Sequence, residues 1–303
     1  MNNSLPSLPD LDYIKPSSFD EASQFLANHP TDARPFLGGT DCFVRLRDRA
    51  WKANYLVDLK HLSGMKELRI LPGGGLEIGA AVNMNKVIED REVKGHFPVL
   101  VQAASQVAGY QLRSRATVIG NICNASPCGD TVGPCLAYDG ILTIHAGSTE
   151  KKLPVKDFIL GPGKTQLVPG EIVKSIFLPF PPKGAKGTYL SIGRNAMGDL
   201  AAVAVTALGW PAEDAPSGCR FRIYLSAVAP TVIPVPEAEK FLASHKVNDE
   251  SIDQAATLAM ETCRPIDDIR SGKEYRKAMV KELVKRALHH VVGQLHGIDK
   301  EGK

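Results

Sequence analysis

The chain has 303 residues, 44% of them hydrophobic and 23% charged, the ordinary balance of a globular protein long enough to form two domains. Its net charge of +3, with the two signs interspersed, and its 6% of aromatic residues argue against a nucleic-acid-binding surface, which needs a basic face and stacking rings. The sequence has no apolar run of the roughly 18 residues that a membrane helix needs, no secretory signal over residues 1–10, and only six cysteines, too few for a disulfide scaffold, so we expect a cytoplasmic protein that does not enter a membrane.

The first half of the chain alternates short helices and strands. Ser18 and Glu21 predict a capping box at the start of the first helix, and Pro30 ends that helix. A longer helical pattern is interrupted at Gly95 and Pro98, which predicts two pieces. In chain order we expect a helix at 18–29, then a strand, glycine turn and short helix at 34–45, a buried strand at 55–59 and a hairpin at 68–80. These are followed by helices within 84–109, a turn-rich segment at 117–130, a helix or compact apolar stretch at 135–138 and a strand at 141–145.

The pattern changes after the proline-rich segment 179–187, where we place a domain boundary. We therefore expect two domains, at 8–182 and 187–296. Strands and helices alternate in both, so the fold class is α+β. In the second domain we expect a helix at 199–208, a strand at 221–228 and helices at 237–243, 251–262 and 274–295.

Two loops of small residues, about eighty positions apart, are the most informative feature of the sequence. The first, LGGTD, occupies 37–41, and the second, TVIGN, occupies 117–121. Glycine lets a backbone come close to an anion, so that successive amides can donate to phosphate oxygens. Side chains of Thr40, Asn124 and Ser126 could add hydrogen bonds, and Asp130 could accept one from a hydroxyl. Neither loop is a GxGxxG or Walker motif, and a bare Gly-Gly pair is more often an ordinary turn.

Six segments of the sequence, two of which contain these loops, are informative when they are taken together. They occupy 36–41, 55–59, 112–127, 194–203, 227–231 and 265–270. In this order they resemble the flavin-binding (medium) subunit of the xanthine dehydrogenase and carbon monoxide dehydrogenase family of molybdenum hydroxylases, over residues 10 to 292. The resemblance implies a two-part FAD-binding domain of the vanillyl-alcohol-oxidase (PCMH) type, followed by a smaller α+β domain of the CO dehydrogenase flavoprotein C-terminal type.

The resemblance also implies a set of FAD-binding residues at the junction of the two domains. Val107 and Val173 would contact the cofactor, Arg194 would reach it from the second domain, and Tyr189 would cover the isoalloxazine face. The set comprises Phe36, Leu37, Gly38, Gly39, Thr40, Asp41 and Cys42 in the first loop, Thr117, Ile119, Gly120, Asn121, Asn124, Ser126 and Asp130 in the second, and Val107, Val173, Tyr189 and Arg194 elsewhere.

The second loop departs from the family at one position. Ile119 stands where the family usually has a glycine. A β-branched residue resists positive φ, so we expect Ile119 to be extended, with its amide still able to donate.

Four cysteines lie in or near the two loops, at positions 42, 123, 128 and 135. Their spacing matches no standard iron–sulfur motif, and we expect ordinary buried thiols, with an extra cluster left open as the alternative. The sequence has no Ser-His-Asp, HExxH or paired-carboxylate pattern. We therefore predict no catalytic residue and no metal site in this chain, whose chemistry would belong to the flavin.

The implied function is electron transfer within an oxidoreductase. A molybdopterin-binding large subunit would act on the substrate, a small subunit with [2Fe–2S] clusters would carry electrons, and FAD on this chain would exchange them with an outside partner. The resemblance implies a heterotrimer or a dimer of heterotrimers. Two alternatives stay open: a self-sufficient FAD-dependent oxidoreductase acting on a small substrate, and a nucleotide-binding assembly module without flavin. The organic substrate, the external electron partner (NAD⁺, oxygen, a quinone or a ferredoxin) and the direction of flow also stay open.

Overall fold

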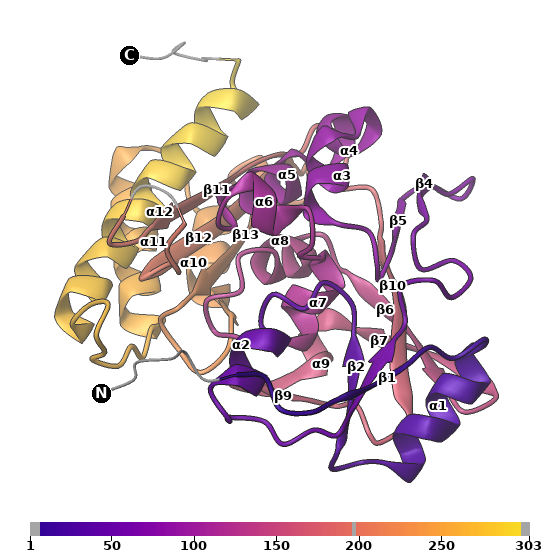
Figure 1. Ribbon diagram of the computed structural model, residues 1–303. Coiled ribbons are helices and arrows are strands. Elements are labelled where there is room, and N and C mark those ends of the chain that lie inside the picture. Colours follow the sequence, from indigo (N-terminus) through magenta and orange to yellow (C-terminus); the bar gives the residue numbers. More distant parts are fainter. Residues whose placement is uncertain (1–6, 196–197, 298–303) are drawn as a thin grey trace.

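The computed structural model describes residues 7–195 and 198–297 (Figure 1). The chain begins with a three-stranded parallel sheet of order β1-β3-β2, formed by Asp12–Ile14, Tyr55–Asp58 and Ala33–Phe36. Helix α1 (Phe19–Asn28) connects β1 to β2, and its Ser18 cap accepts from the amide of Glu21 as predicted. The reciprocal half of the predicted capping box is wrong, because the Glu21 carboxylate accepts from Ser17 instead.

A five-stranded antiparallel sheet of order β4-β5-β10-β6-β7 forms the centre of the first part of the molecule. Its middle strand, β10, is buried on both faces over most of its length, which explains its run of apolar residues. The strands are β4 (Leu68–Ile70), β5 (Leu76–Gly79), β10 (Glu171–Leu178), β6 (Ile141–Ala146) and β7 (Thr149–Pro154). The predicted strand at 55–59, the hairpin at 68–80 and the strand at 141–145 are confirmed.

Short helices connect β5 to β6 and cover this sheet. The stretch 84–109 holds three helices rather than the predicted two, because Asp90 ends one helix and caps the next by accepting from the amides of Glu92 and Val93. Gly95 lies inside the second helix and does not break it. The helices are α3 (Met84–Glu89), α4 (Arg91–His96), α5 (Pro98–Gln106), α6 (Tyr110–Arg113), α7 (Val118–Cys123) and α8 (Val132–Ala137), and after β7 come α9 (Val155–Phe158) and a small hairpin of β8 (Ile159–Gly161) and β9 (Lys164–Thr165).

The second part of the molecule is a four-stranded antiparallel sheet backed by three helices (Figure 1). The strands follow one another in the sheet as they do in the chain. They are β11 (Lys186–Ile192), β12 (Val203–Pro211), β13 (Cys219–Ser226) and β14 (Ile233–Pro234), and the helices are α10 (Pro236–Ser244), α11 (Asp249–Thr262) and α12 (Lys273–Leu295). The three C-terminal helices and the strand at 221–228 were predicted correctly, within a few residues at each end.

The helix predicted at 199–208 is wrong, because most of this segment lies in strand β12. Both faces of β12 are buried: Ala204 and Leu208 belong to the core of the first part, whereas Val203 and Val205 belong to the core of the second. A strand covered on both faces has no polar alternation, so its apolar run reads like a buried helix. Among the described helices, none is long and apolar enough to cross a membrane.

Candidate functional site

The two glycine loops, at residues 37–41 and 117–121, lie close together in the fold. The first follows β2 and leads into α2 (Cys42–Arg47). Gly38 lies so close to the chain entering the second loop that a Cβ on it would be 2.1 Å from the carbonyl oxygen of Arg115. Gly39 has a φ of +77°, a conformation that suits glycine. Close packing therefore requires a glycine at position 38, and the positive φ favours a glycine at position 39.

A single side chain joins the two loops. Asn124 donates from Nδ2 to Oδ1 of Asp41 at 3.1 Å, and its Oδ1 accepts from a guanidinium nitrogen of Arg45 at 2.7 Å. Arg45 is held in turn by Trp51, whose ring centroid lies 4.7 Å from the guanidinium carbon. The first loop and the helix after it are thus fixed against the second loop by a charged, directional contact.

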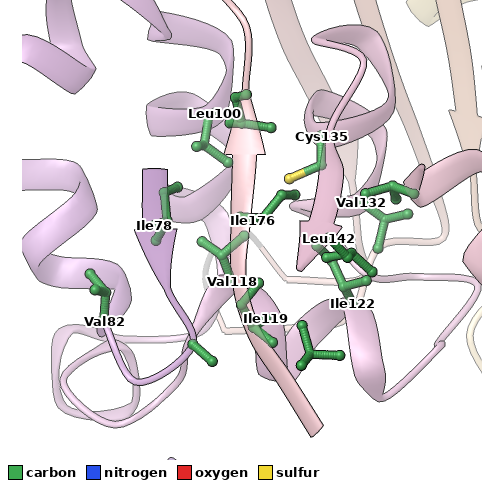
Figure 2. Packing of buried hydrophobic residues seen from close by; sticks show 14 of the residues in the cluster. Ile78, Val82, Leu100, Val118, Ile119, Ile122, Val132, Cys135, Leu142 and Ile176 are labelled. Atoms are coloured by element: carbon green, nitrogen blue, oxygen red, sulfur yellow. The ribbon is translucent and has the colours of Figure 1, made fainter. Parts of the chain in front are cut away.

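The second loop begins a helix, so the prediction that Ile119 is extended is wrong. Thr117 caps α7 by accepting from the amide of Gly120 at 2.9 Å, and Ile119 occupies the first turn. Figure 2 shows Ile119 within the core, where Val118 and the strand residue Ile176 also pack. Ile119 is 1% exposed, so only its backbone could face a ligand. An isoleucine fits here because its side chain fills the core and its φ is not positive.

The loop after α7 carries the carboxylate of Asp130 into a cavity of about 190 Å³ between the two parts of the molecule. Asn121 holds the loop ends together, because its Oδ1 accepts from both the amide and the hydroxyl of Thr131, at 3.2 and 2.8 Å. The described residues around the cavity are Gln106, Asp130, Ser191, Ile192, Gly193, Arg194, Asn195, Gly198, Asp199 and Ala201.

Asp130 has an unusual partner in Tyr189, whose hydroxyl donates to its Oδ1 at 2.6 Å. Burial raises the pKa of Asp130 to about 6, although the hydrogen bond from Tyr189 opposes that rise. Burial and the nearby carboxylate also hold the pKa of Tyr189 well above its usual range, so this hydroxyl keeps its proton. The second oxygen of Asp130 is left to accept from a hydroxyl in the cavity.

Across the cavity, Arg194 is paired with Asp199. The backbone amide and Nε of Arg194 both donate to the carboxylate, at 3.1 and 3.2 Å. The hydrogen bond from Arg194 lowers the pKa of Asp199, and the pair brings both signs of charge to the lining of the cavity. Residues 196–197, inside the predicted block 194–203, lie outside the described residues.

The remaining predicted residues divide between the loops and the interior. Val173 is buried on β10, and Val107 is half-buried in a small cluster with Met84 and Ala104. Tyr189 is 5% exposed within the core, so its ring is not open to cover a flavin. In the first loop, the partly exposed residues are Leu37, Gly38, Gly39 and Thr40, the exposed one is Asp41, and the buried ones are Phe36 and Cys42. In the second loop, Thr117 is buried, and the partly exposed residues are Gly120, Asn121, Asn124, Ser126 and Asp130.

Sequence reasoning missed several residues of this region, Arg45, Asp199 and Ser191 among them. Arg45 lies on α2 and reaches Asn124, and a basic residue near the start of the helix that follows the Gly-Gly pair was a signal for it. Asp199 and Ser191 line the cavity from the second part of the molecule. Ser191 lies between Leu190 and Ile192, which gave no signal, whereas Asp199 lies within the block 194–203 but was not singled out as a site residue.

The cysteines near the loops are separate free thiols. All six cysteines are unpaired, and burial raises the pKa of Cys123 and Cys135 to about 12. Cys128 instead accepts from Arg270 at 3.1 Å. Over residues 7–195 and 198–297, no group of three or more His, Cys, Asp or Glu side chains is arranged to hold a metal ion.

The donor set suits an elongated ligand with an anionic centre and a hydroxylated chain. Helix α2 begins at Cys42 and helix α7 at Val118, and the first amides of a helix have no acceptor within it. Arg45 adds positive charge on one side, and Asp130 offers an acceptor to hydroxyls on the other. These groups fit FAD, whose diphosphate needs donors and whose ribityl chain needs acceptors.

Two protein-family models together match most of the chain. Residues 9–181 match the family model of the FAD-binding domain in molybdopterin dehydrogenase, and residues 188–291 match that of the CO dehydrogenase flavoprotein C-terminal domain. The xanthine dehydrogenase FAD-binding subunit of Escherichia coli O157:H7 is 29% identical over 288 residues, which are 94% of this chain and 97% of that subunit. The carbon monoxide dehydrogenase medium chain of Hydrogenophaga pseudoflava is 27% identical, covering 93% of this chain and 96% of that one.

Solved structures share the fold over nearly the whole length. Carbon monoxide dehydrogenase from Hydrogenophaga pseudoflava superposes with a TM-score of 0.90 at 27% identity, covering 95% of this chain and 99% of its own. Quinoline 2-oxidoreductase from Pseudomonas putida 86 gives 0.87 at 26% identity, covering 96% and 99%. Both the predicted family and the predicted two-part α+β fold are confirmed by these likenesses.

Proposed function

Because this chain belongs to the family of FAD-binding subunits of molybdopterin-dependent dehydrogenases, we propose that it relays electrons between the [2Fe–2S] clusters of a partner subunit and an external acceptor or donor. The chain is an oxidoreductase component that binds FAD. Oxidation or reduction of the organic substrate then belongs to another subunit.

The meeting of the two glycine loops beside the interdomain cavity supports this assignment most directly. A Cβ on Gly38 would collide with Arg115, and Asn124 links Asp41 to Arg45, so the loops form one preorganised edge. Asn121 in the second loop accepts from Thr131, which follows the cavity-lining Asp130, so this edge is linked to the cavity that Asp130 and Arg194 line. The arrangement provides donors for a diphosphate and an acceptor for a sugar chain.

The residues of the chain act by binding and orientation. The amides of the two loops hold the diphosphate, Asp130 orients the hydroxylated chain, and Arg194 with Asp199 forms the far wall of the cleft. The side chains of Phe36 and Ile119 are buried and support the two loops from the protein interior. When bound, FAD supplies the one-electron and two-electron chemistry that links clusters to an external partner.

The two domains proposed for this role are residues 8–182 and 187–296. The segment between them joins β10 to β11, and the sheet that follows carries residues 191–201 to the cavity. Each domain contributes one wall of the cleft, which is a common position for cofactor sites.

The partners proposed are a molybdopterin-binding large subunit and a small [2Fe–2S] subunit, in a heterotrimer or a dimer of heterotrimers. Carbon monoxide dehydrogenase from Hydrogenophaga pseudoflava contains a medium chain similar to this one over 96% of its length, and a related structure is described as a Cu,Mo-CO dehydrogenase. The external partner would be NAD⁺, oxygen, a quinone or a ferredoxin.

Affinity purification of the tagged chain from its native source tests this role. We expect FAD, molybdenum and iron to elute together with two additional polypeptides. A matched tagged Gly38→Ala chain should recover less flavin. Recovery of the chain with FAD but without molybdenum, iron or other polypeptides would contradict the relay and favour a self-sufficient flavoenzyme.

A further inference from the structure

The hydrogen bond between Tyr189 and Asp130 crosses the junction between the two parts of the molecule. Tyr189 comes from β11, whereas Asp130 lies in the loop between α7 and α8. The 2.6 Å bond uses one carboxylate oxygen. The backbone amide of Tyr189 is itself fixed, because it donates to Oε1 of Gln102 at 2.8 Å.

This contact is built into the core, unlike the exposed ion pairs elsewhere on the chain. Tyr189 is 5% exposed and packs within the main hydrophobic cluster, so its ring cannot turn away without opening the interior. Asp130, by contrast, reaches the cavity. The tyrosine therefore sets the direction in which the carboxylate presents its free oxygen.

We propose that Tyr189 is a positioning residue that fixes Asp130 as an ionised acceptor for a hydroxyl of FAD, and that protonation of this carboxylate weakens FAD binding. The inference rests on the proposed function, because it requires FAD in this cleft. It assigns Tyr189 a role different from covering the isoalloxazine ring.

The sign of the pH dependence follows from the chemistry of the pair. Only the ionised carboxylate accepts on its free oxygen while Tyr189 donates to the other, so FAD binding favours the ionised form. Burial raises the pKa of Asp130 to about 6. FAD affinity is therefore full above this pH and falls as the pH drops through it.

No other group around the carboxylate explains such a midpoint. Arg194 and Asp199 line the same cavity as an ion pair, and the hydrogen bond from Arg194 lowers the pKa of Asp199. Cys128 lies two residues before Asp130 in the loop and accepts from Arg270, while Tyr189 stays protonated. Among the described residues that line the cavity there is no histidine. The diphosphate of FAD is a diester and has no proton that titrates in this range.

The test measures the dissociation constant of FAD for the flavin-stripped, full-length chain by fluorescence quenching across the acidic and neutral range. For the wild type we expect about tenfold weaker binding at pH 5 than at pH 7, because a carboxyl with a pKa of about 6 is mostly protonated at pH 5. In Tyr189→Phe the hydrogen bond that favours the ionised form is lost, so the midpoint should rise by about one pH unit. Asp130→Asn should bind FAD more weakly than wild type at neutral pH, with a flat profile.

Tyr138→Phe is the matched control. Tyr138 is also a buried tyrosine, packed against Phe97 with ring centroids 5.1 Å apart, and it does not line the cavity. Its profile should match wild type. A wild-type profile without a midpoint, or one that Asp130→Asn leaves unchanged, overturns the inference while FAD binding and the proposed function stand. If the wild-type chain binds no FAD at any pH, the proposed function fails with it.

Discussion

At the scale of single residues, the site depends on a few positions where one atom decides what fits. The two adjacent glycines illustrate two different constraints. Gly38 has no room for a side chain beside the carbonyl of Arg115, whereas Gly39 has a positive φ. The sequence predicted that both glycines matter for a turn or a close approach. It could not distinguish them, because the neighbour of Gly38 is remote in the chain.

We expect Gly38→Ala to separate the two loops and weaken FAD binding at least tenfold, with a loss of about 2 kcal/mol in the free energy of unfolding from overpacking. The Cβ would lie 2.1 Å from a backbone oxygen, which cannot turn away as a side chain would. Isothermal titration with FAD and urea denaturation measure both effects.

Gly73→Ala serves as the control for this substitution. Gly73 has no atom within 4 Å of an added Cβ, and its φ is not positive. It should leave FAD affinity unchanged. Equal FAD affinity in Gly38→Ala and wild type would mean that the close approach of the loops is irrelevant to the cofactor.

At the scale of elements, the sequence predicted those helices and strands that show a cap or a one-sided apolar pattern. The helix after Ser18 and the three C-terminal helices are examples. Strand β12 and helix α7 were missed for opposite reasons. Both faces of β12 are covered by packing that only the fold reveals, and α7 carries a glycine and an asparagine that look like a loop.

The cap of α7 yields a prediction about local order. Thr117→Ala removes the acceptor of the Gly120 amide, so it should cost about 1 kcal/mol of stability and also weaken FAD binding several-fold. Asn248→Ala removes an equivalent cap from α11, far along the chain from the loops. It should cost a similar amount of stability and leave FAD affinity as in wild type. Thermal unfolding with parallel FAD titrations compares the two, and matched losses of affinity would contradict a specific role for α7.

A second element-level prediction concerns the buried Arg276 on α12. Its guanidinium, 2% exposed, donates to the carbonyl of Ala227 at 2.7 Å and to Asp268 at 2.6 Å. Ala227 in turn donates to the carbonyl of Pro127, in the loop that carries Asp130. Asp268 is partly exposed and is also paired with Arg270, so removing Arg276 leaves no unpaired buried charge and should cost about 2 kcal/mol, the worth of its charge-assisted hydrogen bonds.

Arg276→Met should therefore lower the free energy of unfolding by about this amount, measured by denaturant titration. Desolvation raises the pKa of Asp268, but hydrogen bonds from Arg270 and Arg276 outweigh this effect and hold that pKa well below its usual range. Stability from this carboxylate is thus present above its unfolded-state pKa and lost in acid. The variant should lose part of that acid sensitivity. A pH–stability profile parallel to wild type would argue against the pairing.

At the scale of the whole molecule, the two parts share a core. Tyr189, Ala204 and Leu208 come from the second sheet but pack in the hydrophobic cluster of the first part. Arg222 adds a polar link by donating to the carbonyl of Ala137 at 2.6 Å and pairing with Asp139. The sequence predicted a boundary between two units but not how firmly they join, since these contacts link residues about sixty to ninety positions apart.

Because the core is continuous across the junction, we expect the flavin-free chain to unfold in one thermal transition rather than two. Free FAD at about a hundredfold excess over its dissociation constant should raise the free energy of unfolding by about 2.7 kcal/mol and move this single transition upward. Differential scanning calorimetry makes the comparison. Two separate transitions, with FAD shifting only one of them, would contradict a cleft formed jointly by both parts.

The central claim is that the two glycine loops jointly hold the diphosphate of FAD at the junction of the two parts. An experimental structure of the chain with FAD bound tests it most directly. We predict that the diphosphate lies between residues 37–41 and 117–121, with the ribityl chain within hydrogen-bond distance of Asp130. A diphosphate bound away from either loop, with Asp130 facing empty solvent, would contradict the account.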